Sequence, residues 1–225
     1  MMLDPKVWVI IPAYNEEKKI RQVLEELLTI TSNIVVVNDC SADETQTILN
    51  DLPVHFLTHL VNRGQGAALQ TGTQFALNQG AEIIAHFDAD GQMQINDISK
   101  AVQPLLNNEA DISLGSRFLD NKSQVPLTKK YFILKPASLL NWFLTGLKLT
   151  DAHCGFRALT RQAAQKIEIQ QDGMAHATEI LDQIRLHNLN YQEVPVEIIY
   201  HEYGQKFSSG FKILRDLIFA KFFRK

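Results

Sequence analysis

The sequence has few cysteines, no long hydrophobic run and no excess of basic residues. Its two cysteines, Cys40 and Cys154, form no Cys-x-x-Cys pair, which excludes a disulfide scaffold and a cysteine-ligated zinc site and favours buried thiols in a reducing compartment. The longest uncharged run in the hydrophobic middle, residues 136–147, is well short of the roughly 20 residues that span a bilayer. The net charge of −3 gives no indication of nucleic acid as a partner.

The N-terminus shows no secretory signal. The apolar stretch 7–13 is short, follows Asp4 and leads directly into charged residues, so we expect the chain in the cytoplasm. We find no internal repeat and no low-complexity segment. A chain of 225 residues that is 45% hydrophobic and 21% charged is typical of one globular domain with, at most, a small extension.

Short apolar, β-branched runs alternate with stretches of helical periodicity through the first half of the chain. Strands are predicted at residues 6–12, 33–38, 53–57, 82–87 and 110–114, and helices at 16–28, 43–50, 66–78 and 96–106. This alternation predicts an α/β fold with a mostly parallel central sheet and helices on both faces. Ligands of such sheets bind at the carboxyl ends of the strands, where we expect five polar residues: Tyr14, Asn15, Asp39, Asp88 and Asp90.

The second half of the chain has a different pattern. A polar stretch at 118–130 precedes a largely apolar helical stretch at 131–147, helices at 161–167 and 177–187, and a strand at 193–200. Residues 1–115 are interpreted as a nucleotide-binding half and residues 116–205 as an acceptor-binding half. No linker separates the halves, so we predict one domain over residues 1–205, followed by a C-terminal helix at 206–225.

Two carboxylates, Asp88 and Asp90, directly follow an apolar strand in Phe-Asp-Ala-Asp-Gly-Gln at residues 87–92. Such a pair can bind one divalent cation, and hard oxygen ligands suit Mg²⁺ or Mn²⁺. The cation can hold a diphosphate and stabilise the charge that builds on it as it leaves. An Asp-x-Asp pair also occurs as a plain solvated turn; the preceding strand and Gly91, which permits a tight turn, favour the metal site.

A second motif, Pro-Ala-Tyr-Asn-Glu-Glu at residues 12–17, ends the first predicted strand. Tyr14 offers a ring and a hydroxyl to a nucleotide base at the sheet edge. Asn15 or Glu16 could instead cap the following helix, which is the simpler interpretation.

A third and a fourth motif follow the next two predicted strands. In Asn-Asp-Cys-Ser-Ala-Asp-Glu-Thr at 38–45, Asp39 stands where an acid can bond a ribose or a base edge, while Ser41 or Asp43 is expected to cap a helix. In Asn-Arg-Gly-Gln-Gly-Ala-Ala at 62–68, the glycines allow close approach of a phosphate or of another helix. The fourth motif is neither a Walker loop nor a dinucleotide fingerprint.

In their order along the chain, these four motifs resemble those of glycosyltransferase family 2, in its dolichol-phosphate mannosyltransferase-like branch of polyprenyl-phosphate glycosyltransferases. Two later stretches match as well: Gly-Ser-Arg at 115–117 and Asp-x-x-Cys-Gly-Phe-Arg at 151–157. The resemblance covers residues 7 to 210 or so. It implies a GT-A fold, an inverting hexosyltransferase activity, a nucleoside-diphosphate sugar donor, and Mg²⁺ or Mn²⁺ as cofactor.

The resemblance also implies roles for single residues. Four would contact the nucleoside: Pro12, Tyr14, Glu16 and Asp39. Asp88 would lie near the nucleotide and the sugar, Asp90 and Gln92 would hold the metal, and Arg117 would face the acceptor phosphate, so the expected catalytic residues are Asp88, Asp90 and Arg117. Residues 201–209 keep the family's basic pattern only in part, which leaves His201 and Lys206 as candidates to screen the leaving diphosphate.

The sequence leaves open which acceptor receives the sugar. The leading hypothesis is a polyprenyl (dolichyl or undecaprenyl) phosphate, whose anionic oxygen needs no strong general base. The alternative is a hydroxyl of a growing glycan or lipid in cell-envelope polysaccharide synthesis, which needs a carboxylate base; Glu179 and Asp182 are candidates, although both could simply lie on a helix surface. A nucleotide-binding module without catalysis is a third possibility, against which the intact Asp88 and Asp90 pair argues.

The C-terminal segment has an apolar stripe at helical spacing: Phe207, Phe211, Leu214, Ile218 and Phe222. Basic residues flank this stripe, a combination typical of a helix that lies in a membrane interface. We therefore expect the chain peripherally on the inner face of the cytoplasmic membrane. Packing of the same stripe on the protein core is the alternative.

Overall fold

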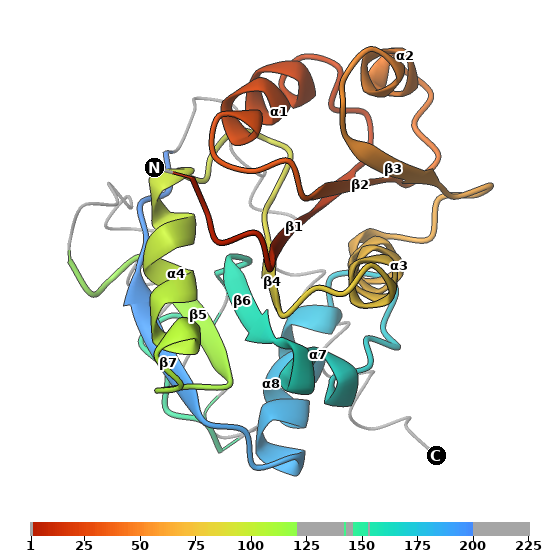
Figure 1. Ribbon diagram of the computed structural model, residues 1–225. Coiled ribbons are helices and arrows are strands. Elements are labelled where there is room, and N and C mark those ends of the chain that lie inside the picture. Colours follow the sequence, from red (N-terminus) through yellow and green to blue (C-terminus); the bar gives the residue numbers. More distant parts are fainter. Residues whose placement is uncertain (1, 121–141, 143–145, 153, 200–225) are drawn as a thin grey trace.

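The computed structural model describes residues 2–120, 142, 146–152 and 154–199. A seven-stranded sheet forms the centre of the molecule, in the order β3-β2-β1-β4-β6-β5-β7 (Figure 1). Its strands are β1 (Val7–Ala13), β2 (Ile34–Asn38), β3 (His55–Thr58), β4 (Ile83–His86), β5 (Ile112–Ser116), β6 (Arg157–Thr160) and β7 (Tyr191–Pro195). All pairings are parallel except those of β6 with β4 and β5, which confirms the predicted mostly parallel sheet.

Helices cover both faces of the sheet, as the alternating pattern predicts (Figure 1). The core on one face is formed with α1 (Ile20–Leu28), α2 (Thr45–Asn50) and α4 (Asn96–Leu106). The core on the opposite face is formed with α3 (Gln65–Asn78), α7 (Arg161–Lys166) and α8 (His176–Leu186). The strand side chains alternate between these cores: Val9 and Ile11 belong to the first, Ile10 to the second.

Strand β6 was not predicted from the sequence. It has four residues and begins with the buried Arg157, so it shows neither an apolar run nor a clear alternation. It lies between β4 and β5 and pairs antiparallel with both, through His86 opposite Arg157 on one side and Leu114 opposite Arg157 on the other. The sheet would otherwise end at β4, so β6 joins the two halves of the chain into one sheet.

The largest differences from the predicted boundaries are at α1 and β7. Helix α1 begins at Ile20 instead of residue 16, because Asn15 has a positive φ of 57° and the residues after it bond to another loop. Strand β7 begins at Tyr191 and ends at Pro195 instead of running from 193 to 200. Beyond β7, an antiparallel bridge joins Ile198 to Met93, so this segment lies beside the Asp88–Asp90 turn.

Several predictions lie outside the described residues. These are most of the apolar stretch 131–147, the candidates His201 and Lys206, and the C-terminal helix at 206–225. In the part of the chain that the structure describes, no helix is long and apolar enough to cross a membrane.

Candidate active site

The loops that follow β1 and β2 are joined by reciprocal hydrogen bonds. Asn15 N donates to Ser41 Oγ at 3.0 Å, and Ala42 N donates to Asn15 Oδ1 at 2.8 Å. Three more bonds continue the contact: Glu16 N to Thr45 Oγ1, Glu17 N to Asp43 Oδ2, and Glu44 N to Glu17 Oε2. The second and third sequence motifs therefore form one double loop at the carboxyl edge of the sheet.

The double loop explains why the predicted helix caps are largely wrong. Helix α1 has Lys19 at its N-cap and α2 has Glu44, and neither makes a side-chain capping bond. Ser41 instead binds Asn15 across the two loops. Asp43 keeps part of the expected role, because its Oδ1 accepts from the N–H of Thr45, the first residue of α2.

The residues predicted to contact the nucleoside lie on or beside this double loop. Tyr14 is 49% exposed and Pro12 is half-buried at the end of β1. The pKa of the half-buried Glu16 is raised, first by burial and then by the nearby charges of Asp90 and Asp43. Glu16 therefore lies within electrostatic range of the Asp-x-Asp turn.

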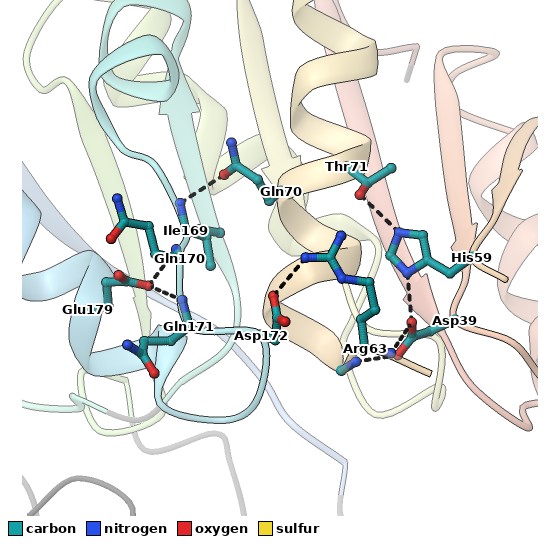
Figure 2. Close-up of polar contacts among 11 residues, drawn as sticks. Asp39, His59, Arg63, Gln70, Thr71, Ile169, Gln170, Gln171, Asp172 and Glu179 are labelled. Carbon is teal, nitrogen blue, oxygen red and sulfur yellow. Dashed lines mark hydrogen bonds and ion pairs between the residues drawn. The ribbon is translucent and has the colours of Figure 1, made fainter. Parts of the chain in front are cut away.

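Asp39 lies at the end of β2 and is almost fully buried. Its Oδ1 accepts from His59 Nδ1 at 2.7 Å and from Arg63 N at 2.9 Å, and its Oδ2 accepts from Gly64 N at 2.6 Å (Figure 2). The other nitrogen of His59 lies 3.0 Å from Thr71 Oγ1. Asp39 thus holds the segment that enters α3. A nucleoside could contact only the part of its carboxylate that these three hydrogen bonds do not occupy.

The glycine motif before α3 is packed against another part of the chain. The carbonyl of Asp172 accepts from Gly66 N at 2.7 Å, and Arg63 Nη2 binds the Asp172 carboxylate at 3.2 Å (Figure 2). A Cβ added at Gly66 would lie 2.0 Å from the carbonyl oxygen of Gln171. Of the two interpretations of these glycines, the structure shows close approach of protein backbone.

Glu179, a candidate base for a hydroxyl acceptor, holds this packed segment in place. The side chain is buried, and its Oε2 accepts from Gln170 N at 2.9 Å and from Gln171 N at 2.8 Å (Figure 2). Glu179 therefore anchors the backbone of residues 170 and 171 through this carboxylate oxygen. The second candidate, Asp182, is exposed on α8.

The Asp-x-Asp turn lies at the end of β4. Gly91 has a φ of 72°, which favours glycine, and Asp90 Oδ1 accepts from Gln92 N at 3.0 Å. Asp88 Oδ1 accepts from Gln65 Nε2 at 2.9 Å, so the turn is tied to the first residue of α3. Burial and the charge of Asp90 raise the pKa of Asp88 to about 7, against the lowering effect of Arg157.

The turn has the chemistry of a cation site that a ligand completes. After burial, the charge of Asp90 is the largest cause that raises the pKa of both Asp88 and Glu16, and a divalent cation would relieve that repulsion. Among the described residues, no group of three or more His, Cys, Asp or Glu side chains has metal-binding geometry. Mg²⁺ commonly binds one or two carboxylates plus substrate phosphates, so Asp90 and Gln92 fit a cation that a diphosphate shares.

Arg117 follows β5 and is buried in an ion pair. Its Nη2 donates to Asp151 Oδ1 at 2.7 Å and its Nε donates to Asp151 Oδ2, so the two groups pair side by side. Thr150 N and Asp151 N in turn donate to Glu193 of β7. The predicted acceptor-binding arginine therefore lies on the side of the sheet edge formed by β5 and β7, with Asp151 setting the orientation of its guanidinium.

Three residues beside Asp88 were not predicted as site residues. Gln65 binds Asp88, a Cβ added at Gly155 would lie 3.2 Å from Asp88 Oδ2, and the charge of Arg157 acts on Asp88. Gln65 stands in the glycine motif, and Gly155 and Arg157 stand in Asp-x-x-Cys-Gly-Phe-Arg. The sequence marks both motifs, but only the folded structure shows that the glycine motif and the Asp-x-x-Cys-Gly-Phe-Arg motif meet at Asp88.

Comparisons with known proteins identify the family of the chain. The profile of the family described as Glycosyl transferase family 2 matches residues 8–168. UDP-N-acetylglucosamine–dolichyl-phosphate N-acetylglucosaminyltransferase of Methanococcus voltae is 35% identical, over 98% of this chain and 98% of that protein. Undecaprenyl-phosphate mannosyltransferase of Micrococcus luteus is 28% identical, over 91% of this chain and 88% of that protein.

A solved structure shows the same fold. Glucosyl-3-phosphoglycerate synthase of Mycobacterium tuberculosis, in complex with Mn²⁺, uridine diphosphate and phosphoglyceric acid, superimposes with a TM-score of 0.73 at 17% identity. The match covers 94% of this chain and 75% of that one. The predicted GT-A fold is thereby confirmed. The chain belongs to glycosyl transferase family 2 and is a glycosyltransferase.

Proposed function

We propose that this glycosyltransferase moves a hexose from a nucleoside-diphosphate sugar to a polyprenyl phosphate, with Mg²⁺ or Mn²⁺ as its cofactor. The observation that carries the choice of acceptor is the engagement of Glu179 by two backbone N–H groups. A hydroxyl acceptor needs a carboxylate base, whereas a phosphate acceptor is already an anionic nucleophile. Relatives named for dolichyl phosphate and undecaprenyl phosphate acceptors support the same choice.

The donor would bind along the carboxyl edge of β1, β2 and β4. Pro12, Tyr14, Glu16 and the remaining surface of Asp39 would contact the nucleoside, and Asp88 would lie at the sugar. Asp90 and Gln92 would hold the cation on the diphosphate, where a bound cation stabilises negative charge on the leaving group. His201 and Lys206 are the proposed additional cations for that charge.

The acceptor would approach from the side of β5, where Arg117 would bind its phosphate. The ion pair with Asp151 keeps the guanidinium in a fixed orientation, and arginine can offer parallel N–H groups to a phosphate. A phosphate oxygen would attack the anomeric carbon from the face opposite the diphosphate. The new C–O bond forms as the bond to the diphosphate breaks, so the configuration inverts and no proton needs to be removed.

The test is a transfer assay with labelled UDP- and GDP-sugars, with and without Mn²⁺, on a short polyprenyl phosphate and on the matching polyprenol. We expect metal-dependent product on the phosphate alone. Asp90→Asn should abolish transfer and weaken Mn²⁺-dependent binding of the nucleotide in calorimetry, because it removes a charged ligand. Product on the polyprenol but not on its phosphate would favour the hydroxyl route and overturn the proposal.

We further propose that the protein works peripherally on the inner face of the cytoplasmic membrane, through the C-terminal segment 206–225. The support is the apolar stripe with basic flanks in the sequence. Replacing both Phe211 and Ile218 by glutamate should release the protein from anionic liposomes in a flotation assay, while turnover of a short soluble acceptor persists. If the wild-type protein does not float, the membrane role is wrong.

A further inference from the structure

Arg157 is a buried cation beside the proposed catalytic turn. It is 3% exposed and lies in β6, directly opposite His86 of β4. Its Nε donates to the carbonyl of Gly155 at 3.2 Å, and Nη2 lies 3.5 Å from the carbonyl of Cys154. Its Nη1 is buried and has no hydrogen-bond partner among the described residues. A buried arginine that binds only backbone carbonyls needs a compensating charge nearby.

Asp88 is the carboxylate that supplies this charge. Burial lowers the pKa of Arg157, while Cys154 and Asp88 act in the opposite direction. The other titratable groups that act together with Arg157 are His86 and His176, and burial and the charge of Arg157 lower the pKa of both, so both are neutral at pH 7. Of these groups, Asp88 is therefore the one that can carry a negative charge to compensate Arg157.

Gly155 connects Arg157 to Asp88 sterically. An added Cβ at Gly155 would lie 3.2 Å from Asp88 Oδ2 and 3.5 Å from the terminal methyl of Met93, so the glycine backbone packs directly against the carboxylate. The carbonyl of the same glycine accepts the hydrogen bond from Arg157. The guanidinium thus fixes the piece of backbone that limits where the Asp88 carboxylate can lie, while Gln65 binds its other oxygen.

We propose that Arg157 is a positioning residue for sugar transfer, which holds the Gly155 backbone against Asp88 and balances part of the negative charge of Asp88. The inference rests on the proposed function, because the part of Asp88 in transfer is itself proposed. Preorganised charge beside a reacting centre acts mainly on the transition state, so its loss lowers kcat more than it changes the KM of the donor.

The test compares Arg157→Met, Arg157→Lys and Arg161→Met. Arg161 is a matched control, because it also donates to two backbone carbonyls, those of Ala81 and Leu77, at the far end of β6. We expect Arg157→Met to lower kcat about 100-fold with the donor KM changed less than about threefold. Arg157→Lys, which restores the charge, should recover at least about tenfold of that loss, and Arg161→Met should retain wild-type kcat.

A second variant removes any dependence on how well Arg157→Met folds. Gly155→Ala adds one methyl group whose nearest neighbours are Asp88 and Met93, so it should lower kcat while the Tm stays close to that of the wild type. Gly173→Ala is its control, since a Cβ there meets nothing within 4 Å. The inference is overturned if both Gly155→Ala and Arg157→Met retain the kcat of the wild type. It is also overturned if kcat falls only in proportion to the fall in Tm and Arg157→Lys restores neither kcat nor Tm. Wild-type turnover on polyprenyl phosphate reports separately on the proposed function.

Discussion

The Gln65 side-chain amide donates a 2.9 Å hydrogen bond to Asp88 Oδ1 and joins the first turn of α3 to the Asp-x-Asp turn. Gln65 stands between the two glycines of its motif, which are packed against the backbone of Gln171 and Asp172. The position of the amide is therefore fixed by the packing of two distant segments. The backbone of Gly155 packs against the other carboxylate oxygen, so the Asp88 carboxylate lies between the Gln65 amide and the Gly155 backbone.

Replacement of Gln65 should affect transfer more than folding. Gln65→Ala removes one hydrogen bond to a carboxylate, so we expect kcat to fall about tenfold. Gln65→Glu should lower it further, because a second negative charge would then face Asp88. Gln103→Glu, an exposed change on α4, is the control. Steady-state kinetics over donor concentration would measure both effects, and a Gln65→Glu variant as active as Gln65→Ala would contradict the electrostatic argument.

Asp39 should matter for both stability and donor binding. Asp39→Ala leaves the N–H groups of Arg63 and Gly64 and the ring of His59 without their acceptor, which should cost about 1–3 kcal/mol of unfolding free energy. The donor KM should rise at the same time, since the segment that enters α3 loses its anchor at the nucleoside end of the site. Urea unfolding and donor titration would separate the two effects. An unchanged donor KM in Asp39→Ala would show that Asp39 does not contribute to donor binding.

Stability should fall below neutral pH because of His176. Burial and the charge of Arg157 lower its pKa from 6.5 to about 4, although its ring nitrogen binds the carbonyl of Gly173. The unfolded chain thus takes up a proton at a higher pH than the folded chain. The contribution of neutral His176 to the unfolding free energy is fully present above pH 6.5. It is lost as the pH falls towards 4, and the total loss is about 3 kcal/mol.

A His176→Gln variant tests this explanation. Glutamine has no proton to gain in this range, so urea midpoints measured from pH 7.5 to 4.5 should fall less steeply than those of the wild type. Part of the slope should persist, because burial lowers the pKa of His86 as well. Parallel slopes for the two proteins would show that His176 does not control the acid sensitivity.

The sequence predicted the features that depend on local pattern. The apolar runs of β1, β2 and β4 and the carboxylates after them follow from periodicity and from the geometry of parallel sheets. It did not predict β6, whose position between β4 and β5 depends on pairings with residues more than 40 positions away. Nor did it predict that Ser41 binds Asn15 instead of capping a helix, because short polar side chains suit either partner equally well.

The ion pair of Arg117 and Asp151 allows the stability and the function of one residue to be separated. Arg117→Ala removes the guanidinium that pairs with the buried Asp151 carboxylate, so we expect a loss of about 3–5 kcal/mol of unfolding free energy. This loss alone would lower activity in any assay. The single variant therefore cannot distinguish an acceptor role from a structural one.

A double variant, Arg117→Met with Asp151→Leu, removes both charges and replaces them with apolar side chains. Buried ion pairs exchanged in this way often lose little stability, so the double variant should recover most of the lost unfolding free energy. If Arg117 binds the acceptor phosphate, turnover on polyprenyl phosphate should stay at least about 100-fold below wild type, while nucleotide affinity in calorimetry is retained. Recovery of turnover together with stability would show that the pair serves the fold and that another cation receives the acceptor.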